Sequence, residues 1–208
     1  MSTTIPIDQV DRESIVGLGL ELRIRLAESV EEMRTRFEEF VAQNPELNVE
    51  QEQSGEIVIM SPTGAEGSSI NSEIVRQLGN WAVTNGGKTF DSSGMFIFAN
   101  GAKRAPDAAW ISAKRWDTVS VEDRKKFPHI APDFVVELRS ETDRLAALQA
   151  KMQEYIGNGV QLGWLIDPLE RQVHVYCAGE QTVVLENPKS ISGGDVLNGF
   201  VLELKHIF

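Results

Sequence analysis

The sequence has a single cysteine, Cys177, among its 208 residues. An internal disulfide is therefore excluded, and a zinc site built from cysteines would need more thiols than the chain contains. No run approaches the roughly 18 uncharged apolar residues that a membrane-spanning helix requires. The N-terminal residues also lack the basic and apolar regions of a signal peptide. From these absences we expect a cytoplasmic protein without a membrane partner.

Basic residues are also scarce, since 20 Lys and Arg stand against 31 Asp and Glu and give a net charge of −11. Such a balance argues against a protein that coats nucleic acid through a general basic surface. The deficit is uneven, because residues 1–56 hold 13 acids and 5 bases, whereas residues 57–208 hold 18 acids and 15 bases. The interval from Lys103 to Lys126 is locally basic. A solvated loop or helix face is its more common explanation, and a nucleic-acid contact is the alternative.

The hydrophobic pattern predicts alternating helices and strands. Apolar residues every three or four positions predict helices over Leu26–Gln43 and Ser68–Thr84, with a helical turn near Val121–Phe127. Ser140 and Asp143 have the spacing of a capping box, which predicts a third helix from Ser140 to Ile156. The predicted strands are Glu56–Met60, Lys88–Asp91, Met95–Ala99, Asp107–Ile111, Asp133–Leu138, Gln161–Asp167, Gln172–Cys177, Thr182–Leu185 and Phe200–Leu204.

This order of elements predicts an α/β (α+β) fold, with a mixed β-sheet flanked by helices and a β-rich C-terminal extension. A chain of this length fits one domain with a modest addition. We therefore predict an N-terminal extension over residues 1–25 and a single domain over residues 26–208.

Two acids interrupt segments that otherwise resemble core strands. Asp107 follows Pro106 in a segment that continues as Ala-Ala-Trp-Ile, and Glu137 lies within Phe-Val-Val-Glu-Leu. An ionised carboxylate is costly to bury unless its charge is compensated. Taken singly, Asp107 would be explained as a turn residue, and Glu137 as half of a salt bridge with Arg139 or Arg144.

The helix predicted after Ser140 has two basic residues along one edge. Arg144 and Lys151 are seven residues apart and lie along one edge of its apolar face. A helix that packs back on the sheet directs this edge toward the end of the Glu137 strand. Two carboxylates with a nearby ammonium group are what a Mg²⁺-dependent phosphodiesterase site requires. The alternative for Lys151 is a side chain that extends along an exposed flank.

Four segments together resemble the Uma-type putative restriction endonucleases of the PD-(D/E)XK nuclease superfamily. They are Glu56-x-Val58-x-Met60-Ser61-Pro62, Pro132-Asp133-Phe134-Val135-Val136-Glu137-Leu138-x-Ser140, Lys151-x-x-x-Tyr155, and Gly159-Val160-Gln161-x-x-Trp164-Leu165-Ile166-Asp167-Pro168. The Pro-Asp pair before Trp110 fits the same pattern.

This resemblance implies a restriction-endonuclease-like core and Mg²⁺-dependent hydrolysis of DNA phosphodiester bonds, with Mn²⁺ as an alternative ion. It implies that Asp107 and Glu137 bind the metal, with Glu73 on the preceding helix as a further metal ligand. The superfamily's lysine usually lies two residues after the second acid, where this chain has Arg139. The resemblance therefore assigns the catalytic lysine to Lys151 and leaves Arg144 and Arg139 as phosphate contacts.

Two other functions stay open at this point. A catalytically inactive protein that binds nucleic acid or another partner would keep the fold, and Arg139 at the usual lysine position is compatible with it. A sugar hydrolase could use the two acids as an acid–base pair, but it would have no use for Lys151. A homodimer is compatible with the sequence, because two sites related by a two-fold axis commonly cut the two strands of a duplex.

Overall fold

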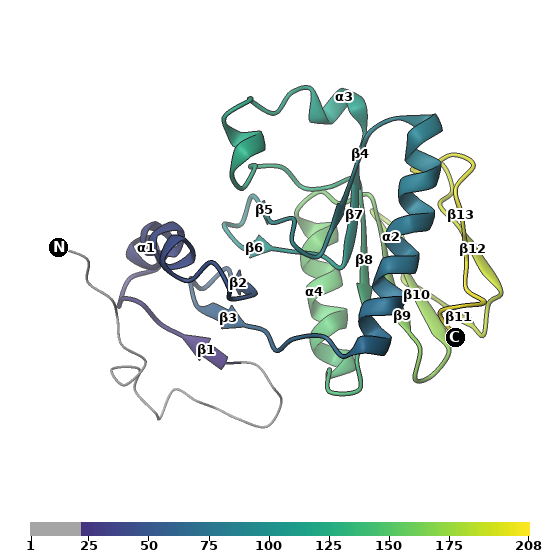
Figure 1. Ribbon diagram of the computed structural model, residues 1–208, viewed down its shortest axis with the longest axis horizontal. Coiled ribbons are helices and arrows are strands. Elements are labelled where there is room, and N and C mark those ends of the chain that lie inside the picture. Colours follow the sequence, from purple (N-terminus) through teal and green to yellow (C-terminus); the bar gives the residue numbers. More distant parts are fainter. Residues whose placement is uncertain (1–21) are drawn as a thin grey trace. The chain divides into compact units, whose positions relative to one another are not determined.

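Figure 1 shows the computed structural model, which describes residues 22–208. The first of its two units consists, within the described part, of residues 22–62 and 100–104, and the second of residues 63–99 and 105–208. The predicted extension over residues 1–25 falls largely on residues 1–21, which lie outside the described part, so the proposed domain division stays a prediction. In residues 22–208 no helix has the length and apolar character needed to cross a membrane.

Among its described residues, the first unit contains one helix and four antiparallel strands. The strands lie in the order β1 (Leu22–Ile24), β3 (Ile57–Ile59), β2 (Val49–Gln51) and β6 (Lys103–Arg104). Helix α1 (Val30–Gln43) begins four residues later than predicted, because Ser29 caps it by accepting a hydrogen bond from the Glu32 amide at 3.2 Å. The capping serine, and not the first apolar residue, sets the start of this helix.

The first two bases of the Lys103–Lys126 interval are buried in this unit, so the solvated loop or helix face expected for the interval does not include them. Arg104 is 6% exposed and pairs with Glu50 at 3.1 Å and with Glu52 at 2.7 Å. Lys103 is 5% exposed and donates to Gln51 Oε1 at 2.8 Å. Both cations are therefore satisfied internally, as buried charges must be.

The second unit is built on a six-stranded mixed sheet, which confirms the predicted α/β fold. Its strands lie in the order β11-β10-β9-β8-β7-β4. Only the β8–β9 pair is parallel, and helix α4 connects these two strands. The bounds are β4 Lys88–Asp91, β7 Ala108–Ile111, β8 Phe134–Leu138, β9 Leu162–Asp167, β10 Gln172–Cys177 and β11 Val183–Glu186.

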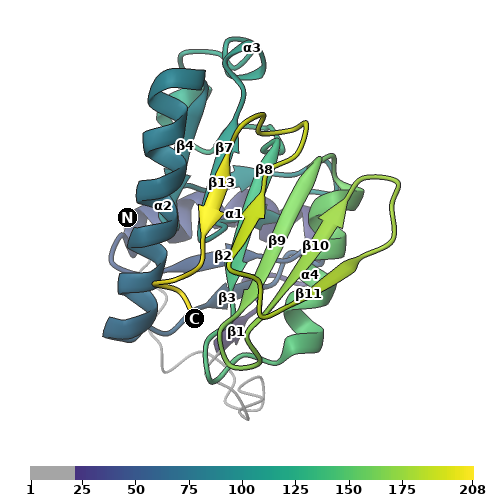
Figure 2. The same cartoon turned by 90° about the vertical axis from the view of Figure 1, so that its right-hand side faces the viewer.

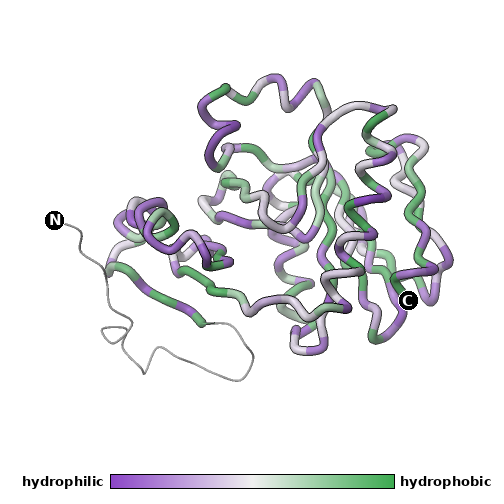
Figure 3. Tube along the Cα trace, viewed as in Figure 1, coloured by the Kyte–Doolittle hydropathy of each residue, from purple (hydrophilic) through white to green (hydrophobic). Residues whose placement is uncertain are grey.

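Two helices cover opposite faces of this sheet (Figure 1, Figure 2). Helix α2 (Ala65–Asn85) lies on one face together with the hairpin of β12 (Ser190–Ser192) and β13 (Val201–Glu203). Helix α4 (Leu145–Gly157) lies on the other face. Each helix alternates between hydrophobic and hydrophilic residues (Figure 3), so that one side packs on the strands. The sheet is therefore buried on both faces, and its central strands are almost wholly apolar.

The ends of both helices differ from the sequence prediction. Helix α2 begins three residues earlier, at Ala65, after a Gly64 that contributes no side-chain cap. Helix α4 begins five residues later, at Leu145. The predicted capping pair does form, because the Ser140 amide and hydroxyl both donate to Asp143 Oδ2 at 2.7 Å. It closes a separate turn before the helix, and Arg144 takes the capping position.

Several short elements differ from the sequence prediction. Helix α3 (Ala113–Trp116) follows β7 and was not predicted, whereas the helical turn expected near Val121–Phe127 is present as a single 3₁₀ turn, Asp123–Lys125. The predicted strand Met95–Ala99 is confirmed in a shorter form, β5 (Phe96–Ile97). Strands β2, β6 and β12 were not predicted, because each has only two or three residues and hardly any alternation to detect.

Candidate active site

Asp107 and Glu137 lie at one end of the neighbouring strands β7 and β8. The antiparallel register pairs Ala108 with Val136, and one further step along both strands brings Asp107 opposite Glu137. Residues that face each other across a sheet point to the same side of it. The two predicted acids are therefore neighbours on the face that α4 covers.

Glu137 is a buried carboxylate whose charge is compensated from α4. Its residue is 4% exposed. Lys151 Nζ lies 3.0 Å from Glu137 Oε1 and 3.1 Å from Oε2. The hydroxyl of Tyr155 donates to Oε1 at 2.7 Å. One ammonium group and one neutral donor thus supply the partners that an acid at this depth needs.

The sequence spacing explains why both partners reach the same acid. Lys151 and Tyr155 are four residues apart, so they lie on one side of α4, one turn above the other. Tyr155 and Met152 are fully buried against the sheet, and they fix which side of the helix faces the strands. The Lys151 side chain keeps 14% of its surface exposed, and its ammonium group therefore lies at the border between the core and solvent.

Asp107 is held from two directions. The backbone amide of Leu138 donates to its Oδ2 at 2.8 Å, which ties Asp107 to the end of β8. The side-chain amide of Asn71 donates to its Oδ1 at 3.0 Å and ties it to α2. Asp107 is thus fixed between a strand and a helix, next to Glu137.

Asn71 itself has an unusual environment. Its Oδ1 is buried and has no hydrogen-bond partner within residues 22–208. A buried carbonyl oxygen normally has one, because leaving it without a partner costs free energy. This oxygen belongs to the same amide group that contacts Asp107, and it therefore marks a place where the site has an unused acceptor.

The structure does not bring Glu73 to the two acids, contrary to the expectation that it supports the metal. Residues 71 and 73 differ by about 200° around a helix, so they cannot face the same neighbour. The Glu73 carboxylate binds Arg76 at 2.6 and 2.8 Å and Gln77 at 2.9 Å. The hydrogen bond from Arg76 lowers the pKa of the Glu73 carboxyl below its usual value.

The two arginines expected to contact phosphate lie in different settings. Arg139 Nη1 pairs with Asp167 Oδ2 at 2.6 Å, and Asp167 is fully buried. The backbone amide of Arg139 also donates to the Ile166 carbonyl at 2.9 Å, which extends the β8–β9 ladder beyond Leu138. Arg139 therefore anchors the end of β8. Arg144 is an exposed residue immediately before α4.

The oxygen ligands at this place fit a magnesium ion. Mg²⁺ is commonly bound by one or two carboxylates together with substrate phosphates. Across the described residues 22–208, no three His, Cys, Asp or Glu side chains gather in a way that could hold a metal. A metal would therefore rest on Asp107 and Glu137 alone among the acids, and the partnerless Oδ1 of Asn71 would be a neutral third oxygen.

Two residues of the site had no functional role in the sequence prediction. Tyr155 belongs to the segment Lys151-x-x-x-Tyr155, and its ring packs in the core, but the sequence pattern gives no hint of what its hydroxyl contacts. Asn71 had a detectable signal, because it lies beside Ile70 and one turn before Ile74 and Val75, close to the apolar face of α2. A polar residue beside such a face warrants attention.

Comparisons with known proteins bear on the fold and the family of this chain. A solved structure of a putative nuclease belonging to DUF820 from Anabaena variabilis ATCC 29413 has a TM-score of 0.65 and 22% identity, and the match covers 77% of this chain and 89% of that one. That similarity shows a shared fold. A DrdV–DNA complex matches with a TM-score of 0.36 and 16% identity over 74% of this chain and 12% of that chain, which is too distant to carry an argument. No curated protein matches the sequence.

The family comparison covers most of the chain. Residues 31–205 match the model of the Uma2 family, which is described as putative restriction endonuclease. That span includes both acids, the lysine of α4 and both helices that cover the sheet. The chain belongs to the Uma2 family.

Proposed function

We propose that this protein is a metal-dependent endonuclease that hydrolyses DNA phosphodiester bonds at a site formed by Asp107, Glu137 and Lys151. The observation that carries the proposal is the contact of Lys151 Nζ with the Glu137 carboxylate at 3.0 Å. Because position 139 holds an arginine, the proposed reaction needs a lysine that reaches the acids from α4. The contact of Lys151 with Glu137 supports Lys151 in that role. Membership of the Uma2 family supports the same reaction.

Asp107 and Glu137 would hold Mg²⁺, or Mn²⁺, with Asn71 Oδ1 and the carbonyl of Leu138 as neutral oxygens. When bound, such an ion lowers the pKa of a water molecule and polarises the scissile phosphate. The residues themselves do the positioning. Leu138 fixes one oxygen of Asp107, and Tyr155 fixes one oxygen of Glu137, so both carboxylates keep their orientation without rearrangement.

Lys151 would act on the phosphate and not on the metal. Its ammonium group lies at the edge of the core, where it can orient the attacking water or neutralise charge that develops on a phosphoryl oxygen. Arg144 is exposed and lies two turns before Lys151. We propose that it contacts the same phosphate as Lys151. Arg139 would have to leave the buried Asp167 to do the same, so we assign it to positioning the end of β8.

Cleavage of supercoiled plasmid DNA by the purified full chain tests the proposal. We expect nicked or linear product with Mg²⁺ or Mn²⁺ and none with EDTA. Asp107→Asn and Glu137→Gln each remove one metal-binding charge with little change of shape, and we expect each to abolish cleavage. Activity that survives either substitution or EDTA would reject the assignment. Sedimentation of the same protein tests whether it acts as the homodimer that double-strand cutting favours.

One observation favours the competing proposal of a nucleic-acid-binding protein without catalysis. Within residues 22–208 no third acid joins the pair, which limits the charge available to hold a metal. Calorimetric titration separates the two proposals. Binding of Mg²⁺ or Mn²⁺ that Asp107→Asn removes supports the nuclease, whereas the absence of any metal binding supports the competing function.

A further inference from the structure

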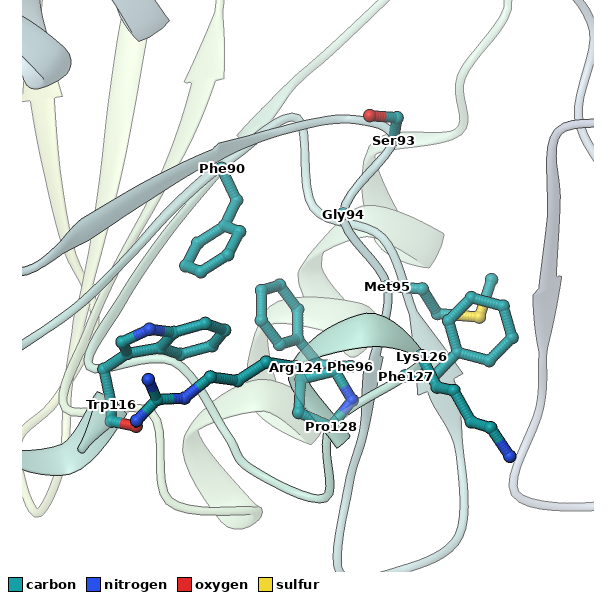
Figure 4. Close-up of a pocket in the computed structure, with 10 residues that line it drawn as sticks. All are labelled: Phe90, Ser93, Gly94, Met95, Phe96, Trp116, Arg124, Lys126, Phe127 and Pro128. Atoms are coloured by element: carbon teal, nitrogen blue, oxygen red, sulfur yellow. The ribbon is translucent and has the colours of Figure 1, made fainter. Parts of the chain in front are cut away.

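A cavity of about 190 Å³ lies in the second unit, near the segment that joins β7 to β8 (Figure 4). Four aromatic rings, those of Phe90, Phe96, Trp116 and Phe127, contribute to its walls. Phe90 and Phe96 have ring centroids 5.1 Å apart and perpendicular planes, and Phe90 and Trp116 are 5.4 Å apart. Figure 4 shows these three rings on one side of the cavity, with Phe127 on the other. The cavity is thus a slot with mixed walls, in which aromatic rings lie beside polar and charged side chains.

Two cations border this aromatic slot. Arg124 lies over the Trp116 ring, with its guanidinium carbon 5.2 Å from the ring centroid. It is fixed there by hydrogen bonds to the Trp116 carbonyl at 2.9 Å and the Val119 carbonyl at 3.0 Å. Lys126 contributes its stem to the lining, and its ammonium group points away from the rings (Figure 4). Positive charge therefore lies at the border of the slot and not inside it.

Aromatic faces with cations at the border are the features that bind a nucleotide, because the base stacks on the rings and the phosphate meets the cations. A volume of about 190 Å³ is below that of the pockets that hold drug-sized molecules, about 300–1,000 Å³, so it suits one base. A paired base is stacked inside the duplex and presents only its edges, so it cannot enter such a slot.

The slot lies on the same face of the sheet as the candidate active site. Phe96 is buried in the hydrophobic cluster that also contains Tyr155, and Phe90 and Trp116 pack against that cluster. Tyr155 in turn contacts Glu137. The slot and the acids are therefore joined through one packed cluster of the second unit.

We propose that this slot binds one unpaired nucleotide of the DNA strand, so that the preferred substrate contains a single-stranded stretch. This inference rests on the proposed function, because only a nuclease would have this DNA strand as its substrate. Its test does not require catalysis, because binding can be measured with EDTA present. A failure of one proposal can therefore be told apart from a failure of the other.

The test is fluorescence anisotropy of the full chain with a labelled twelve-residue oligothymidylate, compared with a labelled duplex of the same length. We expect tighter binding of the single strand. Trp116→Leu should weaken that binding about ten-fold, because it removes a stacking surface. Circular dichroism of the variant shows whether the fold is retained.

A pair of neighbouring lysines gives a matched control. Lys125 and Lys126 are both exposed and differ in that only Lys126 lines the slot. Lys126→Ala should lower the slope of log affinity against log salt by about one, whereas Lys125→Ala should leave it unchanged. Equal effects of the two changes would show general electrostatic attraction and overturn the proposal.

Two further results would also overturn it. The first is binding of the duplex as tight as that of the single strand, with no effect of Trp116→Leu. The second is displacement of the labelled oligonucleotide by thymidine 5′-monophosphate when both are present at the same concentration of nucleotides. That result would show that the slot binds free nucleotides.

Discussion

The hydroxyl of Tyr155 donates to Glu137 Oε1 at 2.7 Å, in the interior of the second unit. Both residues are buried, Tyr155 fully and Glu137 to 96%. The tyrosine therefore supplies a neutral hydrogen bond that holds the carboxylate in place while Lys151 supplies the charge. A hydrogen bond to a buried charged group contributes about 1.5–3 kcal/mol.

Tyr155→Phe removes this hydrogen bond and keeps the ring. We expect the free energy of unfolding to fall by about 1–2 kcal/mol and the cleavage rate to fall about ten-fold, because the carboxylate loses its fixed orientation. Urea unfolding and plasmid nicking measure the two effects. Tyr176→Phe is the matched control, because Tyr176 is buried in the same cluster and we assign it no role in the site. Equal losses in both variants would show that the Tyr155 hydroxyl has no special role.

Lys151→Met tests the ion pair with Glu137. Removing one partner of a buried pair leaves the other charge uncompensated, so we expect the unfolding free energy to fall by about 3 kcal/mol. Adding Glu137→Gln should restore most of this stability, because the remaining charge is gone. Neither variant should cleave DNA.

The controls for this pair separate structure from catalysis. Lys205 is exposed in the same unit, and Lys205→Met should change neither stability nor cleavage. If the double variant Lys151→Met/Glu137→Gln is no more stable than Lys151→Met alone, the contact of Lys151 with Glu137 is not the stabilising interaction that the geometry indicates.

Asn71→Ala removes the donor to Asp107 and the partnerless Oδ1 together. We expect the affinity for Mg²⁺ to fall about ten-fold, within the range for loss of a group that orients a metal ligand. Asn71→Asp should instead lower the free energy of unfolding in EDTA, because the new carboxylate and that of Asp107 repel each other. Addition of Mg²⁺ should restore that free energy. Calorimetry and thermal unfolding measure these effects.

Asn80→Ala is the control for both changes, because Asn80 is an exposed asparagine on the same helix. Asn80→Ala should leave the affinity for Mg²⁺ unchanged, and the gain in stability when Mg²⁺ is added should equal that of the wild type. Mg²⁺ affinity that is unaffected by Asn71→Ala would remove Asn71 from the metal site.

The sequence predicted Asp107 before β7, Glu137 on β8 and Lys151 on α4 because each departs from a regular pattern. Asp107 and Glu137 interrupt apolar runs, and Lys151 lies at the edge of an apolar helix face. Glu73 and Asn71 show the limit of this reasoning. Both lie near the apolar face of α2, and only packing against the strand end decides which of them faces Asp107.

Arg139 shows a second limit. From the sequence it is simply a cation two residues after an acid, and a phosphate contact is a natural prediction. Its partner, Asp167, is 28 residues away on β9. The parallel pairing of β8 and β9 creates this contact, and local spacing carries no information about it. The same holds for Lys103 and Arg104, whose partners lie on β2 and in its neighbourhood.

Arg139→Met tests the structural role assigned to this arginine. It leaves the fully buried Asp167 without its cation, so we expect the unfolding free energy to fall by about 3 kcal/mol. Asp167→Asn in the same chain should recover part of the loss. The salt dependence of DNA binding should stay as in the wild type, because no phosphate contact is removed. A salt slope lowered by about one would instead make Arg139 a phosphate ligand.

Lys103 makes stability depend on pH in the first unit. Burial lowers the pKa of its ammonium group from 10.5 to about 8. Between these two values the unfolded chain binds more protons than the folded chain, so the unfolding free energy rises with pH. From pH 8 to pH 9.5 we expect a gain of about 1.5 kcal/mol. Lys103→Met should remove the slope.

Urea unfolding followed by circular dichroism, with hydrogen exchange of the α1 amides, measures this effect. All four tryptophans lie in the second unit, so their fluorescence reports on the unit without Lys103 and provides an internal control. The slope should appear in the α1 amides and be absent from the fluorescence. A wild-type profile that is flat between pH 8 and 9.5, or a slope that Lys103→Met retains, would show that Lys103 is not the titrating group.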